Sequence, residues 1–285
     1  MHVFISPRII RLIDLAIEED ELGFDVTSQV FFEGERARAQ LIAKQALVVA
    51  GLDVVRAVFA RVDPGVRCEF AVEDGQAIES GMTLGWLEGD AVSLLRAERT
   101  ALNFLQRMSG VASLTASFVA QMGSSTTRIV DTRKTLPGWR ELDKYAVRCG
   151  GGTNHRFNLA GGVMIKDNHI AAAGGIQQAF ERVREQAPHA LRVEIEVSNL
   201  EELSAALETG AEIVMLDNMN TETMSAAVQQ VRAHRHGQRV LIEASGNMTR
   251  ERLPELRDIG LDFISVGALT HSASAVDISM RVVLP

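Results

Sequence analysis

The second half of the chain repeats one short pattern, in which an apolar run ends at or beside a polar residue and a helical segment follows. Six such runs occur, at 128–131, 163–166, 193–196, 213–217, 240–243 and 263–266. Nearly continuous Val, Ile, Leu and Met is typical of parallel strands buried on both faces. Amphipathic spacing between the later runs predicts helices over 176–186, 200–209, 222–234 and 250–259.

Signals at the ends of these helices support the pattern. Ser198 and Glu201 have the spacing of a capping box, and Thr249 is a predicted N-cap. Three glycines stand where a left-handed residue is expected to end a helix, namely Gly210, Gly237 and Gly260.

Six strands separated by about one βα unit each predict either a β/α barrel or an open doubly wound sheet. In a barrel the carboxyl ends of all strands face one mouth, and here polar residues stand at the end of strand after strand. An open sheet would gather such residues at one switch point, and no GxGxxG follows the first strand. The sequence therefore favours a β/α barrel.

The first hundred residues follow a different pattern. A helix is predicted over 9–19, strands over 37–43 and 47–51, and hairpin turns around Asp63 and Asp74. Residues 93–122 predict one long helix, or two in sequence, and 276–282 alternates as a strand with one buried face does. We predict an α+β domain over 1–107, joined by a C-terminal strand within 275–285, and a barrel domain over 108–274.

Composition narrows the function. The formal net charge is -8 and basic runs are absent, which argues against a nucleic-acid surface. No apolar stretch approaches the roughly 18 residues that a membrane span needs, and the first residues lack a signal-peptide pattern. Cys68 and Cys149 are far apart in sequence, so we expect two free thiols in a reducing, cytoplasmic setting.

Cations concentrate between residues 131 and 169. Only four lysines occur in the chain, and Lys134, Lys144 and Lys166 fall in this window. In an acidic protein this cluster indicates a pocket for a small anion, with solvated surface charges as the alternative.

If the strands form as predicted, charged residues gather at the barrel mouth. They are Asp131, Arg133, Lys134, Lys166, Glu196, Asp217 and Glu243. Such a rim suits a polyanionic substrate whose phosphates or carboxylates meet the cations, while Glu196 and Asp217 hold Mg²⁺ through water or bind hydroxyl groups. A purely structural ion-pair network is the alternative.

Three loops add to this prediction. The segments 245–249 and 265–268 each follow a late strand and open a helix, where barrels commonly bind phosphate. Glycines 150–152 precede His155 and Arg156, and indicate a tight segment that presents both side chains to a ligand rather than a flexible connector. His169 and His271 are secondary candidates.

Nine motifs, in order along the chain, resemble the quinolinate phosphoribosyltransferases, also called carboxylating nicotinate-nucleotide pyrophosphorylases. They are ERTALN at 98–103, DTRKTLPG at 131–138, KYAVRCGGG at 144–152, NHR at 154–156, IKDNHI at 165–170, EIEV at 194–197, LDN at 216–218, EASGN at 243–247 and ISVGALTH at 264–271. Two positions depart from the family's pattern, since 159–163 lacks an expected acidic residue and Trp139 replaces an aliphatic one.

The resemblance implies an N-terminal α/β sandwich, an incomplete α/β barrel and a homodimer, or a higher oligomer, with shared active sites. It also implies the reaction, in which quinolinate and phosphoribosyl pyrophosphate (PRPP) give nicotinate mononucleotide, pyrophosphate and CO₂ with Mg²⁺, in NAD biosynthesis.

The resemblance also implies roles for particular residues. Arg99 is expected to reach the partner's site. The quinolinate carboxylates and the pyrophosphate are expected to be bound by Arg133, His155, Arg156 and Lys166, with Thr132 and Lys134 beside them. The ribose and the metal-bound water are expected to be bound by Glu196 and Asp217. The 5′-phosphate is expected to be bound by Ser245, Gly246, Asn247, Val266, Gly267 and Ala268. His271, the last residue of the final motif, is a further expected substrate-binding residue. The implied catalytic set is Lys134, Lys166, Glu196 and Asp217.

Two other functions stay open at this point. A barrel lyase or aldolase would use Lys166 as a Schiff-base amine. A carrier module would use a hairpin near 74–89 but needs a modifiable lysine there, and no lysine occurs between Lys44 and Lys134. A relative of the family associated with molybdate transport genes shares the general pattern.

Overall fold

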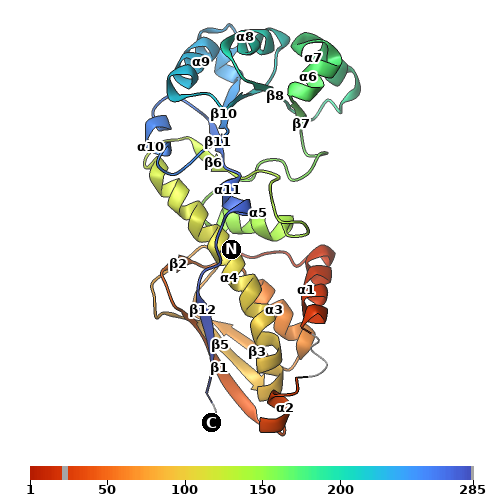
Figure 1. The fold of residues 1–285 in the computed structure, drawn as a ribbon, viewed down its shortest axis with the longest axis vertical. Coiled ribbons are helices and arrows are strands. Elements are labelled where there is room, and N and C mark those ends of the chain that lie inside the picture. The colour runs from red at the N-terminus through yellow and green to blue at the C-terminus, as the bar shows by residue number, and fades with distance from the viewer. Residues whose placement is uncertain (21–24, 284–285) are drawn as a thin grey trace. The chain divides into compact units, whose positions relative to one another are not determined.

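The structure is a computed structural model that describes residues 1–20 and 25–283 (Figure 1). By its internal contacts the chain divides into two units. The first consists of Met1–Ala116, Thr135–Gly151 and Ala268–Pro285, and the second of Ser117–Lys134 and Gly152–Gly267. The domain boundary predicted between residues 107 and 108 falls inside one helix and stays a prediction.

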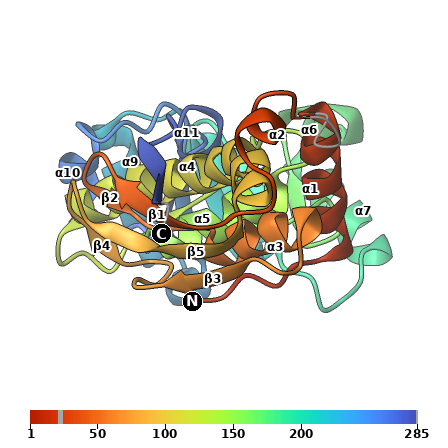
Figure 2. The ribbon, with the colours of Figure 1, turned by 90° about the horizontal axis from the view of Figure 1, so that it is seen from below.

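The first unit is built around an antiparallel sheet with strand order β12-β1-β5-β3. Its strands, with a second small pair β2-β4, are β1 (Arg36–Ala43), β2 (Leu47–Val48), β3 (Arg67–Phe70), β4 (Ala77–Ile78), β5 (Thr83–Asp90) and β12 (Ile278–Val283). Its helices are α1 (Pro7–Glu19), α2 (Ser28–Phe31), α3 (Leu52–Val62), α5 (Arg140–Cys149), α11 (Ala268–His271) and most of α4 (Ala91–Met122). Figures 1 and 2 show α1, α3 and the start of α4 on one face of this sheet.

Alternating burial explains the sheet and the return of the C-terminal strand to it. Successive side chains of β1 point to opposite faces, and Ala37, Ala39 and Leu41 are buried. The strand β12 pairs antiparallel with β1, from Arg38 opposite Val283 onward. This pairing confirms that the alternating C-terminal segment belongs with the first domain.

The two longest helices of the first unit that were not expected from the sequence are α3 and α5. Three residues separate the end of β2 from the start of α3, so the strand predicted over 47–51 stops at Val48. Gly51, at φ 113°, caps α3, and the buried carboxylate of Asp74 accepts the N–H groups of Gly51 and Leu52. The helix α5 is rich in charged residues, and it buries two of them, Asp143 and Lys144.

The second unit holds six parallel strands in the order β6-β11-β10-β9-β8-β7. They are β6 (Arg128–Val130), β7 (Val163–Ile165), β8 (Val193–Val197), β9 (Ile213–Asp217), β10 (Leu241–Ser245) and β11 (Phe263–Ser265). All six strand predictions are confirmed. The edge strands β6 and β7 are not paired with each other in the described residues, so the β/α barrel is incomplete.

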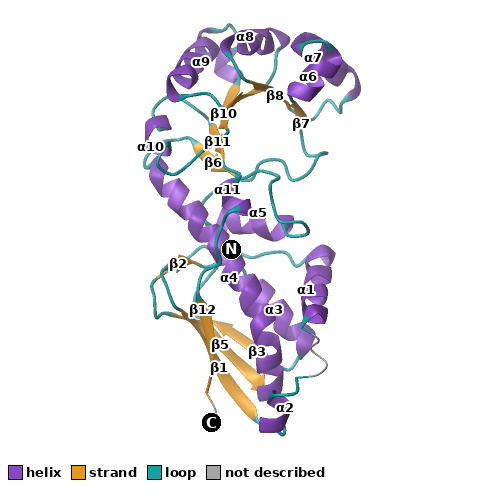
Figure 3. Ribbon diagram, in the orientation of Figure 1, coloured by secondary structure: helices purple, strands orange, loops and turns teal. Residues whose placement is uncertain are grey.

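Helices cover the outer side of this curved sheet (Figure 3). They are α6 (Asp167–Ala173), α7 (Ile176–Gln186), α8 (Leu200–Thr209), α9 (Thr221–Ala233) and α10 (Leu253–Leu256), with a 3-10 turn η1 (Gly237–Arg239) before β10. The end of α4 belongs to this unit as well.

Three predictions about helix ends were wrong. The helix α8 is capped by Asn199, one residue after the predicted Ser198, and the Asn199 side chain accepts the Glu202 N–H. The helix predicted over 250–259 is a single turn, α10, which Thr249 does not cap. Gly237 opens the 3-10 turn and does not end α9. Gly210 does end α8, at φ 84°.

Within the described residues, no helix combines the length and apolar character that crossing a membrane requires.

Candidate active site

A cavity of about 490 Å³ lies at the carboxyl ends of the second unit's strands. Its lining comes from the segments that follow β6 and β7 and from the last residues of β8 to β11. The lining residues are Thr132, Arg133, Lys134, His155, Arg156, Met164, Lys166, Glu196, Met215, Asp217, Asn218, Glu243, Ser245 and Ser265. We call this cavity the mouth cavity.

The lining is mainly charged. It carries four cations, Arg133, Lys134, Arg156 and Lys166, beside three carboxylates, Glu196, Asp217 and Glu243. An excess of positive charge in a concave site favours anionic ligands. The thioether side chains of Met164 and Met215 add apolar surface, which the sequence analysis did not anticipate because both methionines looked like ordinary strand core.

Lys166 and Glu196 form an ion pair at the ends of neighbouring strands. The Lys166 Nζ lies 2.8 Å from Glu196 Oε2. Both side chains are partly exposed to the cavity. A carboxylate thus engages the Lys166 amine, so the geometry does not favour a Schiff-base lyase. His169 accepts the Lys166 N–H through Nδ1 at 3.0 Å, so this histidine serves to begin α6.

Asp131 does not line the mouth cavity, contrary to the prediction that it would join the rim. Its side chain is fully buried. The carboxylate accepts the backbone N–H of His155 at 2.9 Å and the side-chain amide of Asn154 at 2.6 Å. Asp131 therefore anchors the segment that carries His155 and Arg156.

The glycine run before this segment is tightly packed, not a loose connector. A Cβ on Gly150 would lie 2.3 Å from the Ala112 carbonyl oxygen, so only glycine fits there without displacing the backbone. Gly151 has φ 83°, a conformation that glycine adopts without steric cost.

The first predicted phosphate loop differs from expectation in its helix. Ser245 lines the mouth cavity, and Gly246 and Asn247 follow it with left-handed φ values of 89° and 49°. Asn247 donates to the Asn218 side-chain oxygen at 3.2 Å. Because α10 is one turn, a helix dipole gives little support to phosphate binding there.

The second predicted phosphate loop does not line the mouth cavity, and neither do the predicted site residues Arg99 and His271. Val266 is buried and donates to the Val130 carbonyl, and neither Val266 nor Gly267 lines the mouth cavity. Arg99, Ala268 and His271 belong to the first unit, and their roles stay predictions.

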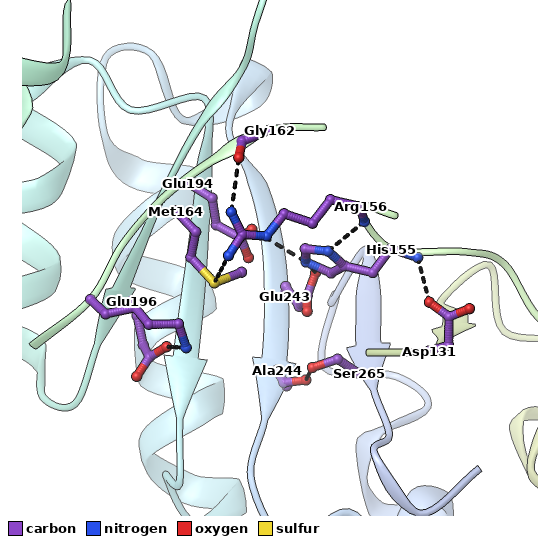
Figure 4. Close-up of polar contacts among 11 residues, drawn as sticks. Asp131, His155, Arg156, Gly162, Met164, Glu194, Glu196, Glu243, Ala244 and Ser265 are labelled. Atoms are coloured by element: carbon purple, nitrogen blue, oxygen red, sulfur yellow. Dashed lines mark hydrogen bonds and ion pairs between the residues drawn. The ribbon is translucent and has the colours of Figure 1, made fainter. Parts of the chain in front are cut away.

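Glu194 is a buried residue that the sequence analysis missed. Glu194 and Glu196 are two residues apart on β8, so both side chains face the barrel interior. Figure 4 shows the His155 ring beside Glu194 and Glu243. Nε2 of His155 lies 3.3 Å from Glu194 Oε2 and 3.5 Å from Glu243 Oε2. Alternating Glu-Ile-Glu within a strand was the signal that could have revealed it.

Burial shapes the electrostatics of this cluster. Loss of solvent and the nearby Glu194 carboxylate raise the pKa of Glu243 to about 7. Burial and the neighbouring Arg133 lower the pKa of Arg156, and the Glu194 carboxylate opposes that effect.

Two groups of side chains have the oxygen or nitrogen donors that metals prefer. His155, Glu194 and Glu243 have ligand atoms within 4.8 Å of one another. However, His155 Nδ1 accepts the Arg156 N–H at 2.7 Å, so Nε2 carries the ring proton and is not a metal donor. Glu196 and Asp217, on adjacent strands and open to the mouth cavity, fit a divalent cation better.

Comparisons with known protein families match almost the whole chain. Residues 25–109 match the family described as quinolinate phosphoribosyl transferase, N-terminal domain, and residues 111–281 match its C-terminal domain.

Individual relatives agree. The chain is 40% identical over 274 residues to a Bacillus subtilis protein named probable nicotinate-nucleotide pyrophosphorylase (carboxylating), covering 96% of this chain and 93% of the relative. It is 39% identical over 288 residues to quinolinate phosphoribosyltransferase (decarboxylating) 1b of Nicotiana tabacum, covering 95% and 81%. The solved structure of the nicotinate-nucleotide pyrophosphorylase from Francisella tularensis superposes with a TM-score of 0.90 at 37% identity, covering 97% of each chain.

Proposed function

The chain belongs to the quinolinate phosphoribosyltransferase family and catalyses the reaction of that family in the de novo synthesis of NAD; we propose that this reaction takes place in the mouth cavity. The reaction transfers the phosphoribosyl group of PRPP to quinolinate and releases pyrophosphate and CO₂, leaving nicotinate mononucleotide. One observation supports the location most strongly: four cations from three segments of the chain line a single cavity at the strand ends.

Quinolinate is a flat dianion, and the deeper part of the mouth cavity suits it. Arg133, Arg156 and Lys166 offer charge-assisted hydrogen bonds to its two carboxylates, with His155 beside Arg156 and Met164 against the ring. Orienting the ring is the main task of these residues. Once the ring nitrogen is ribosylated, its positive charge stabilises the electron pair left on C2 as the 2-carboxylate departs as CO₂, and a proton from water then completes C2.

PRPP then occupies the outer part of the cavity. Lys134 and Arg133 stabilise the negative charge that develops on the departing pyrophosphate, which is the largest requirement of such a transfer. Glu196 and Asp217 face the ribose, where negative charge stabilises an oxocarbenium-like carbon and oxygen atoms accept its hydroxyl groups. Ser245 and the backbone of Gly246 and Asn247 take the 5′-phosphate.

Mg²⁺ fits this arrangement. Carboxylate oxygens are the ligands it prefers, and one or two carboxylates with substrate phosphates are its usual set. Glu196 and Asp217 would hold it through water, and it would neutralise pyrophosphate charge when bound.

The assembly we propose is a homodimer, or a higher oligomer of dimers, in which Arg99 completes the partner's cavity. We also propose a cytoplasmic location, which the free thiols of Cys68 and Cys149 support.

Incubating the purified chain with quinolinate, PRPP and Mg²⁺ tests the proposed function. We expect nicotinate mononucleotide by mass spectrometry, and labelled CO₂ from quinolinate labelled in its 2-carboxylate. Turnover of nicotinate at the same rate would contradict the assignment, because that substrate lacks the second carboxylate.

A further inference from the structure

A partly buried histidine pairs with two buried carboxylates at the wall of the mouth cavity. Glu194 and Glu243 are 4% and 3% exposed. They stand on β8 and β10, with β9 between them. The His155 Nε2 lies within 3.5 Å of an oxygen of each, as Figure 4 shows. We call these three residues the carboxylate clamp.

Each carboxylate has one oxygen that is left without a hydrogen bond. Glu194 Oε1 and Glu243 Oε1 are buried and have no hydrogen-bond partner among the described residues. Placing two carboxyl groups in a dry interior is costly unless they meet donors or opposite charge. Three groups offer this: His155 pairs with both carboxylates through Nε2, the cationic side chain of Arg156 interacts with Glu194, and the Ser265 side chain is hydrogen-bonded with Glu243. The carboxylates therefore favour one position of the His155 and Arg156 side chains.

The histidine ring is fixed at both nitrogens. Nδ1 accepts the backbone N–H of Arg156 at 2.7 Å, so Nε2 carries the proton that points at the carboxylates. The backbone N–H of His155 is bound in turn to Asp131 at 2.9 Å. These contacts fix the backbone from which the Arg156 side chain extends. The two carboxylates of the carboxylate clamp hold the imidazole ring of His155 in place.

A second cavity makes this support necessary. It has a volume of about 420 Å³ and lies at the amino-terminal ends of the strands, where Arg128, Val163 and Ile213 line it. His155, Arg156 and Glu243 line both cavities and so form the wall between them. With open space behind it, the Arg156 guanidinium is otherwise held by the Gly162 carbonyl at 2.9 Å and by Met164 Sδ at 3.6 Å.

We propose that Glu194 and Glu243 are positioning residues for quinolinate: through His155 they hold Arg156 toward the mouth cavity instead of the cavity behind it. This inference rests on the proposed function, in which Arg156 binds quinolinate. The inference predicts an effect on quinolinate binding and not on PRPP binding. Glu196 and Asp217, which face PRPP, make no contact with the carboxylate clamp among the interactions of the described residues.

The test is steady-state kinetics of Glu243→Leu. The leucine keeps the bulk of the side chain but cannot accept from Nε2. We expect the KM for quinolinate to rise about tenfold or more, while the KM for PRPP changes by less than about twofold. Glu243→Gln should lower the raised KM for quinolinate at least about fivefold relative to leucine, because its amide oxygen accepts from Nε2 and its NH₂ donates to Glu194.

Two controls make the result specific. Glu185→Leu, on the exposed face of α7, should leave both KM values unchanged. If Glu243→Leu does not fold, as judged by circular dichroism and thermal unfolding, Glu243→Asp replaces it, since the shorter side chain keeps the charge but withdraws the oxygen. The same selective rise is expected.

The outcomes separate the two proposals. Absence of quinolinate turnover in the wild-type chain would overturn the proposed function. An active wild type whose Glu243→Leu or Glu243→Asp variant leaves the quinolinate KM unchanged, or raises both KM values equally, would overturn the positioning role. Failure of Glu243→Gln to lower the quinolinate KM would overturn it as well.

Discussion

The ammonium group of Lys166 lies 2.8 Å from the carboxylate of Glu196, at the ends of the adjacent parallel strands β7 and β8. The pair joins the two halves of the proposed chemistry. Lys166 faces the anionic ring of quinolinate, and Glu196 faces the ribose that must become positively charged. In the absence of substrate, each side chain holds the other in place.

Removing the ammonium group should therefore abolish turnover without unfolding the chain. For Lys166→Ala we expect kcat/KM for quinolinate to fall by about 100-fold or more, equivalent to roughly 2.7 kcal/mol of transition-state stabilisation. The thermal midpoint should stay within a few degrees, because the side chain is partly exposed. Lys44→Ala, an exposed lysine of the first unit, is the matched control. More than a tenth of wild-type activity in Lys166→Ala would argue against its role.

Stability should fall as the pH rises through neutrality, because of Glu243. Burial and the Glu194 carboxylate raise its pKa from 4.5 to about 7, while His155 opposes the shift and Asp131 adds to it. The folded chain thus keeps a proton that the unfolded chain releases near pH 4.5, and the stabilisation present below that pH is lost by about pH 7.

Thermal unfolding of the wild type and Glu243→Gln at about pH 5.5 and about pH 8.5 measures this effect. The wild type should lose more of its thermal midpoint between the two values than the variant, whose amide does not titrate. An equal loss in both proteins would show that another group is responsible.

Mixing two inactive variants tests the proposed shared site. Arg99→Ala leaves Lys166 intact, and Lys166→Ala leaves Arg99 intact. Random subunit exchange makes about half of the dimers hybrid, each with one intact site, so roughly a quarter of wild-type activity should return. Mass spectrometry of the mixed dimers verifies exchange. No recovery after verified exchange would show that each cavity is complete within one subunit.

The sequence was most informative where burial is uniform. Strands such as Ile213–Asp217 are enclosed on both faces, so their apolar runs stand out, and their parallel arrangement brings Lys166, Glu196 and Asp217 to one mouth. The helix α5 was not predicted because charged residues dominate its sequence, and tertiary contacts bury two of them, Asp143 and Lys144.

The roles of Asp131 and Glu194 could not be predicted from their positions in the sequence alone, because they depend on contacts made in the fold. Asp131 follows β6 and so was expected at the rim, but the N–H groups that need an acceptor lie beneath the loop, and the carboxylate turns inward to them. Glu194 was overlooked as a site residue because its partners His155 and Glu243 are distant in the chain, and the fold brings the three together.

The central claim is that Arg133, Arg156 and Lys166 bind one quinolinate together. Isothermal titration of quinolinate into the wild type and into an alanine variant of each residue measures it directly. We predict that each variant binds at least about tenfold more weakly, or roughly 1.4 kcal/mol, while the exposed control Lys44→Ala binds as the wild type does. Wild-type affinity in all three variants would contradict the account.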